Sequence, residues 1–228
     1  MGGAVFFIPL GGVGFVGKKP CPPYFVWGLH GHKIILTDLT VSNDAMPQYR
    51  RFSIAGGTYF FTVVTYRRRP ILCDAPVRAA LRNAIQTVRA RYPFTINAWV
   101  LLPDHLHCLW TLPPDDANFA KRWALIKRHV SMTCAGEYHR PDWMTASKLK
   151  HRESTFWQRR YWEHCIYSET DFANHLNYIY INPVKHGLVS RVSDWPYSTF
   201  HRDVKNGLYP LDWAGGMDDD DLSVGEPT

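Results

Sequence analysis

Hydrophobic and polar positions follow two periods along the chain, and the shorter period predicts strands. Residues 58–65 (TYFFTVVT) are almost all β-branched or aromatic, which is typical of a buried strand. Residues 96–102 predict a second strand, and residues 106–112 continue the extended pattern after Pro103. Residues 135–156 are polar, and we expect a loop or insertion there.

The longer period, with apolar residues three or four positions apart, predicts three helices. The first is capped by Asp74 and runs to about Tyr92, the second begins at Asp115 or Asp116, and the third runs from Asp171 to about Asn182, where Pro183 ends it. After the third helix we expect a short extended stretch and an aromatic segment at residues 194–200. Strands interleaved with helices on a short chain predict an α+β domain in which helices pack on one antiparallel sheet.

The two ends of the chain differ in composition from its centre. Residues 5–16 are apolar but contain Pro and three Gly, and the run is too short to span a membrane. Patterned sequence begins only near Tyr49, so we expect residues 1–45 to be a dispensable or disordered extension and translation to start naturally at Met46. The predicted domain is therefore residues 46–216, followed by an acidic disordered tail at residues 217–228.

Charge and aromatic content favour a nucleic-acid partner. The formal net charge is +6, and the last twelve residues hold five acidic residues and no Lys or Arg, so the remainder carries +11. Nine Trp, 12 Tyr and 12 Phe offer surfaces on which unpaired bases can stack. The five cysteines are widely spaced without a C-x-x-C pair, which argues against a zinc ribbon and favours a reducing cytoplasm.

A pair of histidines near the middle of the chain is the sharpest chemical feature. His105 and His107 fall in the segment DHLHCLW, and alternate residues of a strand share a face, so both imidazoles project together, about 7 Å apart along the strand. Two such imidazoles can converge on one divalent cation. An H-x-H pair alone is weak evidence, because His30 and His32 form another one without an apolar frame.

The third predicted helix offers a partner for these histidines. With about 100° of rotation per residue, Phe172, Leu176 and Ile179 form the expected buried stripe. A different face carries Asp171, His175, Tyr178 and Asn182. Tyr178 and Asn182 lie one turn apart, so the Asn182 amide could join the histidines on the metal and place the Tyr178 hydroxyl beside a bound phosphate. Tyr180 points elsewhere and is the weaker candidate nucleophile.

Longer stretches of sequence match a known family. Residues 49–51 (YRR), 56–62 (GGTYFFT), 97–110 (NAWVLLPDHLHCLW), 156–164 (FWQRRYWEH), 178–187 (YIYINPVKHG) and 194–200 (DWPYSTF) carry the match. The chain resembles the REP-associated tyrosine transposases, a branch of the single-tyrosine transposases in the HUH (His-hydrophobic-His) endonuclease superfamily. The resemblance covers residues 49 to about 216, and it departs from the family at residues 1–45, 135–156 and the acidic end.

This resemblance implies a ferredoxin-like single domain and a bacterial, cytoplasmic enzyme that is a monomer rather than a dimer. It implies that His105 and His107 bind Mg²⁺ or Mn²⁺ with Asn182 as third ligand and that Tyr178 is the nucleophile, with His175 a possible assistant. The implied substrate is single-stranded DNA beside a short palindromic hairpin, cut through a 5′-phosphotyrosine intermediate. Expected phosphate contacts are Arg50, Arg51, Arg67, Arg68, Arg69, Arg159, Arg160 and Lys185.

Two other functions remain open on the sequence. One is a catalytically silent regulator, which has the same fold and binds repeat hairpins without cutting DNA. The other is a zinc metallohydrolase, which would need a third strong ligand such as His or Asp. The aromatic residues Trp157, Tyr161 and Trp195 could stack on bases, although packing in the core is the better expectation.

Overall fold

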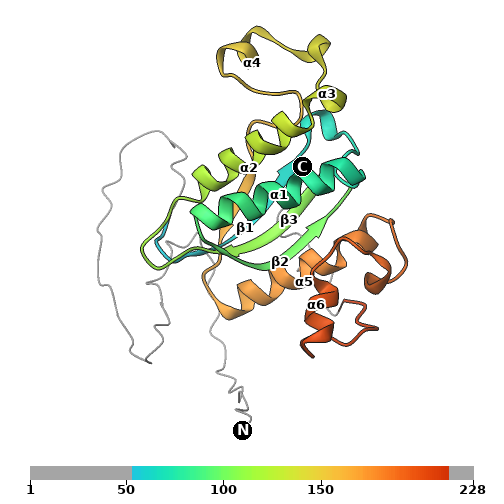
Figure 1. The fold of residues 1–228 in the computed structure, drawn as a ribbon. Coiled ribbons are helices and arrows are strands. Elements are labelled where there is room, and N and C mark those ends of the chain that lie inside the picture. The colour runs from blue at the N-terminus through green and yellow to red at the C-terminus, as the bar shows by residue number, and fades with distance from the viewer. Residues whose placement is uncertain (1–52, 216–228) are drawn as a thin grey trace, which may run out of the picture. The chain divides into compact units, whose positions relative to one another are not determined.

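The computed structural model describes residues 53–215, which are built around a four-stranded antiparallel sheet (Figure 1). The strands are β1 (Thr58–Val64), β2 (Thr95–Leu101), β3 (His105–Thr111) and β4 (Trp162–Cys165), and their order in the sheet is β2-β3-β1-β4. With helix α1 between β1 and β2 and helix α2 between β3 and β4, this is the ferredoxin-like arrangement, so the predicted α+β class is confirmed.

Helices cover both faces of the sheet (Figure 1). The first face is covered by α1 (Ala75–Arg91) and α2 (Phe119–Thr133), whose apolar stripes pack with Tyr59, Phe61 and Val63 of β1 in one hydrophobic cluster. The opposite face is covered by α5 (Glu169–Lys185), which packs against β2 and β3 in a second cluster around Phe60.

Strand alternation separates core-forming from polar side chains on β3. Leu106, Cys108 and Trp110 face α1 and α2, where the Trp110 ring stacks on Trp123 with centroids 4.2 Å apart. His105 and His107 occupy the alternate positions and lie on the side of α5. The period-two pattern therefore directs both imidazoles away from the larger core, as the sequence predicts.

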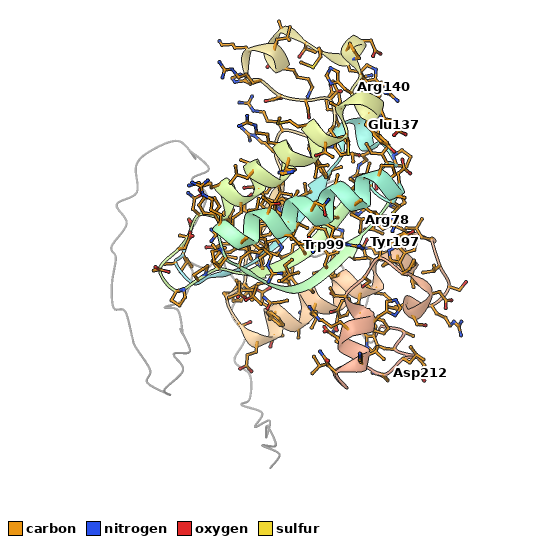
Figure 2. The ribbon with its side chains drawn as sticks, in the orientation of Figure 1. Arg78, Trp99, Glu137, Arg140, Tyr197 and Asp212 are labelled. Atoms are coloured by element: carbon orange, nitrogen blue, oxygen red, sulfur yellow. The ribbon has the colours of Figure 1, made fainter. Side chains whose placement is uncertain are left out.

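The free edge of β2 is covered by the aromatic segment that follows η3 (Val192–Asp194). The backbone N–H of Leu101 donates to the Tyr197 carbonyl, and Thr199 N–H donates to the Trp99 carbonyl. From α1, the Arg78 guanidinium lies 4.5 Å from the centroid of the Tyr197 ring (Figure 2). Covering the edge removes a row of unpaired backbone groups that could otherwise recruit another strand. Helix α6 (Phe200–Lys205), which the pattern does not predict, begins directly after this segment.

Helix α2 starts later than the sequence predicts, and its first turns bury an arginine. It begins at Phe119, where the Asn118 side chain accepts the Lys121 N–H, rather than at Asp115 or Asp116. Arg122 on the same helix is only 1% exposed. Its guanidinium donates to the carboxylate of Asp116 at 2.8 Å and to three backbone carbonyls, so this cation supports the fold and is not a surface charge.

The region expected to be a loop or insertion contains short helices. They are α3 (Ala135–Tyr138), η2 (Pro141–Trp143) and α4 (Ala146–Lys150). The Tyr138 hydroxyl donates to the Asp74 carboxylate at 3.0 Å, and the Arg69 guanidinium donates to the Tyr138 carbonyl. The segment is therefore not a simple loop, because contacts distant in sequence hold it to the start of α1 and to the short helix η1 (Tyr66–Arg68).

Several expectations lie outside the described residues: the extension at residues 1–45, the tail at residues 217–228, and the basic residues Arg50 and Arg51. Within residues 53–215 no helix combines the length and apolar character needed to cross a membrane.

Candidate metal and tyrosine site

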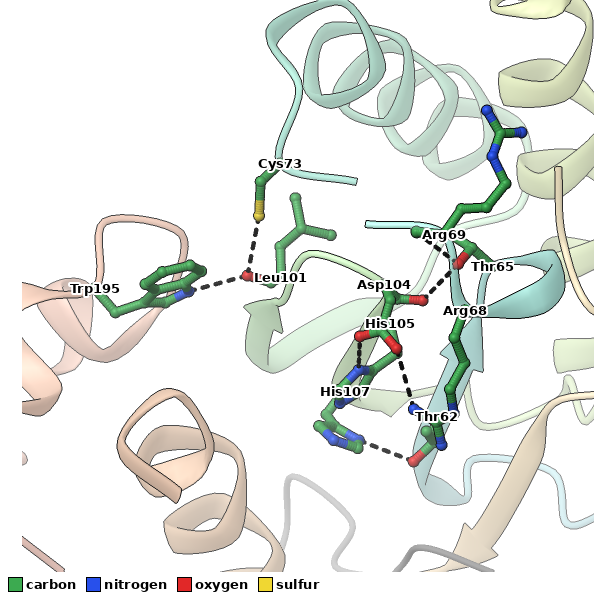
Figure 3. Close-up of polar contacts among 10 residues, drawn as sticks. All are labelled: Thr62, Thr65, Arg68, Arg69, Cys73, Leu101, Asp104, His105, His107 and Trp195. Carbon is green, nitrogen blue, oxygen red and sulfur yellow. Dashed lines mark hydrogen bonds and ion pairs between the residues drawn. The ribbon is translucent and has the colours of Figure 1, made fainter. Parts of the chain in front are cut away.

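The two histidines of the H-x-H pair lie together at the start of β3, on the face that α5 covers (Figure 3). Their ring centroids are 4.8 Å apart, and their side chains are almost completely buried, at 2% exposed for His105 and 0% for His107. Each ring is held through Nδ1. The Nδ1 atom of His105 lies 2.6 Å from an Asp104 carboxylate oxygen, and that of His107 lies 2.8 Å from the Thr62 hydroxyl. An imidazole that is oriented through Nδ1 presents Nε2 to a ligand, as second-shell partners of metal-binding histidines do.

Asp104 connects the first histidine to the strained basic residues of η1. Its other carboxylate oxygen accepts a hydrogen bond from Arg68 at 3.1 Å. Burial would raise the pKa of Asp104, but the hydrogen bond and charge of His105, and then those of Arg68, outweigh it and hold the pKa below its usual range. Arg67 and Arg68 both have positive φ, at 58° and 50°. Side chains other than glycine rarely adopt this conformation, and such strain is concentrated at functional sites.

We expect Asp104→Asn to weaken metal binding without unfolding the protein. The amide keeps the shape of the carboxylate but loses its charge, so it orients the His105 ring less strongly and withdraws support for its basicity. A loss of about 10- to 100-fold in Mn²⁺ affinity follows, measured by equilibrium titration. Asp115→Asn is the matched control, because Asp115 is exposed and follows the opposite end of β3 from Asp104. Equal affinities in the two variants would show that Asp104 does not support the site.

Helix α5 brings the candidate nucleophile and the third ligand to the same histidines. Tyr178 is 1% exposed, and its ring centroid lies 5.2 Å from that of His107. Asn182, one turn later, is fully buried, and neither its amide oxygen nor its amide nitrogen has a hydrogen-bond partner among residues 53–215. A buried amide without a partner is costly, so a ligand for Asn182 is expected at this point.

The predicted faces of this helix need correction. The polar face with Asp171, His175, Tyr178 and Asn182 is buried against the sheet, whereas Phe172 and Leu176 of the expected stripe are only partly buried. Pro183 does not end the helix, which continues to Lys185.

The continuation of α5 adds two residues that the sequence reasoning does not connect with the metal pair. The His186 ring lies 5.1 Å from that of His105, and the Lys185 ammonium lies 5.2 Å from the centroid of the Tyr178 ring. Burial, followed by electrostatic interaction with the neighbouring basic groups His105, His186, Lys185 and Arg68, holds the pKa of His107 well below its ordinary value. His107 is therefore neutral near pH 7 and has a lone pair to offer a cation. The four-residue spacing of Asn182 and His186 is the sequence feature that could have linked His186 to this site.

The suggested assistant, His175, lies one turn before Tyr178 but makes different contacts. Its Nδ1 lies 2.8 Å from the Asp171 carbonyl and 2.9 Å from the Asp171 carboxylate, and its ring packs on Phe60 and His164. These contacts associate His175 with strand β4 rather than with the H-x-H pair.

The expected DNA contacts occupy different environments. Arg67, Arg68, Arg159, Arg160 and Lys185 are exposed, whereas Arg69 is half-buried and donates to a backbone carbonyl. Among the aromatic candidates, Trp157 is 4% exposed and belongs to the core, as expected. Tyr161 packs on Trp123, and the Trp195 indole donates to the Leu101 carbonyl (Figure 3), so both also contribute to the fold.

The donor set fits a divalent cation. Two imidazoles and one amide oxygen are a neutral set of nitrogen and oxygen donors, which suits Mn²⁺ and, when phosphate and water oxygens complete the shell, Mg²⁺. The unsatisfied Asn182 amide is the observation that supports this fit.

Comparison with known proteins identifies the family of the chain. Residues 53–181 match the family model described as "Transposase IS200 like". The REP-associated tyrosine transposase of Escherichia coli K12 is 50% identical over 181 residues, which cover 79% of this chain and 98% of the relative. A counterpart in Haemophilus influenzae Rd is 45% identical over 173 residues, which cover 76% of this chain and 96% of the relative.

A solved structure agrees with the fold. It is described as the REP-associated tyrosine transposase bound to a REP hairpin, and it has 47% sequence identity to this chain with a TM-score of 0.66. The alignment covers 80% of this chain and 99% of that one.

Proposed function

Because the chain belongs to the IS200-like transposase family, as a REP-associated tyrosine transposase, we propose that it cuts and rejoins single-stranded DNA beside a REP-type hairpin. One observation carries the assignment of the site: the Tyr178 ring lies 5.2 Å from His107, with the buried, unpartnered amide of Asn182 one turn further along α5. The name of the solved relative, bound to a REP hairpin, supports the same class of substrate for this chain.

The proposed reaction is a transesterification. The Tyr178 hydroxyl attacks the scissile phosphorus, the bond from phosphorus to the 3′ oxygen breaks, and the leaving strand takes up a proton as a free 3′-OH. Tyr178 then carries the other strand as a 5′-phosphotyrosine. A later attack by a 3′-OH reverses these bonds and rejoins DNA without ATP, because the phosphodiester energy is conserved in the covalent intermediate.

Other residues of the site bind and orient the reactants. His105, His107 and Asn182 would hold Mg²⁺ or Mn²⁺, which supplies Lewis-acid stabilisation of the charge that develops on the phosphate. The Lys185 ammonium, 5.2 Å from the centroid of the Tyr178 ring, offers a positive charge that stabilises negative charge developing on the phosphate. Exposed Arg67, Arg68, Arg159 and Arg160 offer phosphate contacts along the DNA, with Arg50 and Arg51 as further candidates. We place the enzyme in the bacterial cytoplasm and expect it to act as a monomer.

The test uses a hairpin oligonucleotide with a single-stranded flank, labelled at either end, with Mn²⁺ or Mg²⁺. A 5′-phosphotyrosine predicts that the 3′-end label migrates with the protein in denaturing gels, while the 5′-end label appears on a shorter free strand. An oligonucleotide with a scrambled, unpaired stem is the control and should give little adduct. Binding without any adduct would favour the silent regulator, and cleavage without an adduct would favour the metallohydrolase.

A further inference from the structure

A second cluster of potential metal ligands lies where strand β4 meets the start of α5, apart from the histidines of β3. It consists of His164 on β4 and of Asp171 and His175 on α5. One ligand atom from each residue lies within 4.8 Å of the others. None of the three belongs to the set proposed above to hold Mg²⁺ or Mn²⁺.

The two imidazoles approach the same carboxylate from two elements. His164 Nε2 and His175 Nδ1 each lie 2.9 Å from an Asp171 oxygen. The two rings are stacked, with centroids 4.6 Å apart and planes at 14°. Stacked imidazolium ions would repel each other, so one carboxylate with two protonated histidines is an unfavourable arrangement. One divalent cation between the three groups would replace the contacts of both imidazoles with the Asp171 carboxylate without that repulsion.

Asp171 is prepared to remain ionised. Burial would raise its pKa, but hydrogen bonds from His164 and His175, together with the Tyr167 backbone N–H at 3.0 Å, hold the pKa well below its usual range. The orientation of His175 depends on Asp171, because the other ring nitrogen of His175, Nε2, is buried and has no hydrogen-bond partner within the described residues. The carboxylate therefore fixes one ligand and is itself fixed by the backbone.

The cluster is accessible to ions and lies close to residues of the candidate catalytic centre. The side chain of His164 is 29% exposed, whereas those of Asp171 and His175 are 7% and 2% exposed, so an ion can enter from the β4 side and retain water as a further ligand. His175 packs on Phe60, and Phe60 also contacts both His107 and Tyr178. A cation here would tie the edge strand to the helix that carries the candidate nucleophile.

We propose that His164, Asp171 and His175 form a second cation site, selective for a borderline transition metal of the Zn²⁺ class. Two nitrogen donors and one carboxylate favour Zn²⁺ or Co²⁺ over Mg²⁺, which prefers oxygen ligands. On binding, the proton of each coordinating nitrogen moves to the other ring nitrogen, and any imidazolium releases its extra proton to solvent. The site does not depend on whether the histidines of β3 bind metal.

The test counts bound Co²⁺ by visible absorption and elemental analysis on the full chain after removal of metal. All proteins carry His30→Gln and His32→Gln, so the H-x-H pair near the N-terminus does not contribute. We expect two ions per chain in this background and one after His164→Phe, which keeps the ring packing but removes the nitrogen. His129→Phe, at an exposed position on α2, is the control and should retain both ions.

The second variant separates this proposal from the proposed function. His107→Leu should also retain one ion, and the combination with His164→Phe should retain none. An unchanged number of bound Co²⁺ ions after His164→Phe, in a protein with a native circular dichroism spectrum, would overturn the second site. The three residues would then only hydrogen-bond to one another at the start of α5. If His107→Leu leaves the count unchanged while His164→Phe removes one ion, the proposed catalytic centre fails and the second site stands.

Discussion

The variant Tyr178→Phe is expected to form no detectable DNA adduct while retaining its fold. The substitution removes one oxygen atom, and the ring keeps its packing against His107 and Phe60. Loss of a covalent nucleophile costs on the order of 10³-fold or more in rate. The measurement is the yield of labelled protein–DNA adduct at saturating Mn²⁺, together with a binding titration that should change little.

Tyr180→Phe is the matched control for this experiment. Tyr180 lies on the same helix, but its hydroxyl donates to the Asp203 carboxylate, and burial together with Asp203 raises its pKa far above the ordinary value. A phenol that resists ionisation is a poor nucleophile, so adduct yield should be retained in Tyr180→Phe. Loss of a hydrogen bond to a buried charged group should instead lower the free energy of unfolding by about 1–3 kcal/mol. Adduct formation by Tyr178→Phe, or its loss only in a folded Tyr180→Phe, would show that the wrong tyrosine had been chosen.

The candidate site follows from two periodicities that depend only on local geometry. The two-residue period of a strand makes His105 and His107 co-facial whatever surrounds them, and the structure places both rings on the α5 side of β3. The four-residue spacing of Tyr178 and Asn182 similarly places them on one helix face. Such relations hold because neighbouring residues cannot change their relative direction without breaking the backbone hydrogen bonds.

The direction in which a helix face points was harder to predict. Helix α5 buries its polar face because the sheet surface beneath it carries polar side chains, His107 and Thr62, beside the apolar ones that cluster around Phe60. An apolar stripe identifies the buried face only when the opposing surface is apolar. The expectation that Pro183 ends the helix was also wrong. A proline close to a helix C-terminus removes few internal hydrogen bonds, and the last turn could continue to bring Lys185 and His186 to the site.

Other features depend on partners distant in sequence. Strand β4 has only four residues, all partly exposed, so it carries no alternating pattern and is defined by its pairing with β1. Residues 135–156 read as a polar loop because the contacts of Tyr138 with Asp74 and Arg69 are invisible in local composition. The cluster of His164 and Asp171 likewise requires β4 to be placed beside α5.

His107→Leu is expected to abolish metal binding at the candidate catalytic centre and, with it, adduct formation. Leucine fills much of the volume of the buried imidazole but offers no lone pair. Second-shell changes already cost 10- to 100-fold in metal affinity, so loss of one of three protein ligands should exceed about 100-fold. The readouts are Mn²⁺ affinity and adduct rate across a wide range of Mn²⁺ concentrations, with His129→Leu as the control at an exposed position.

The same variant has a consequence for stability that a metal-free measurement can separate from catalysis. The folded pKa of His107 is depressed, so below about pH 6.5 the unfolded chain binds a proton there that the folded chain does not. Protonation of His107 therefore leaves the free energy of unfolding unchanged above that pH. As the pH falls below it, the free energy of unfolding decreases by up to about 1.4 kcal/mol per pH unit. In EDTA, therefore, the wild type should lose stability more steeply below pH 6.5 than His107→Leu. Parallel pH profiles together with unchanged Mn²⁺ affinity would mean that His107 is neither a neutral buried base nor a ligand, and the metal centre would have to be assigned elsewhere.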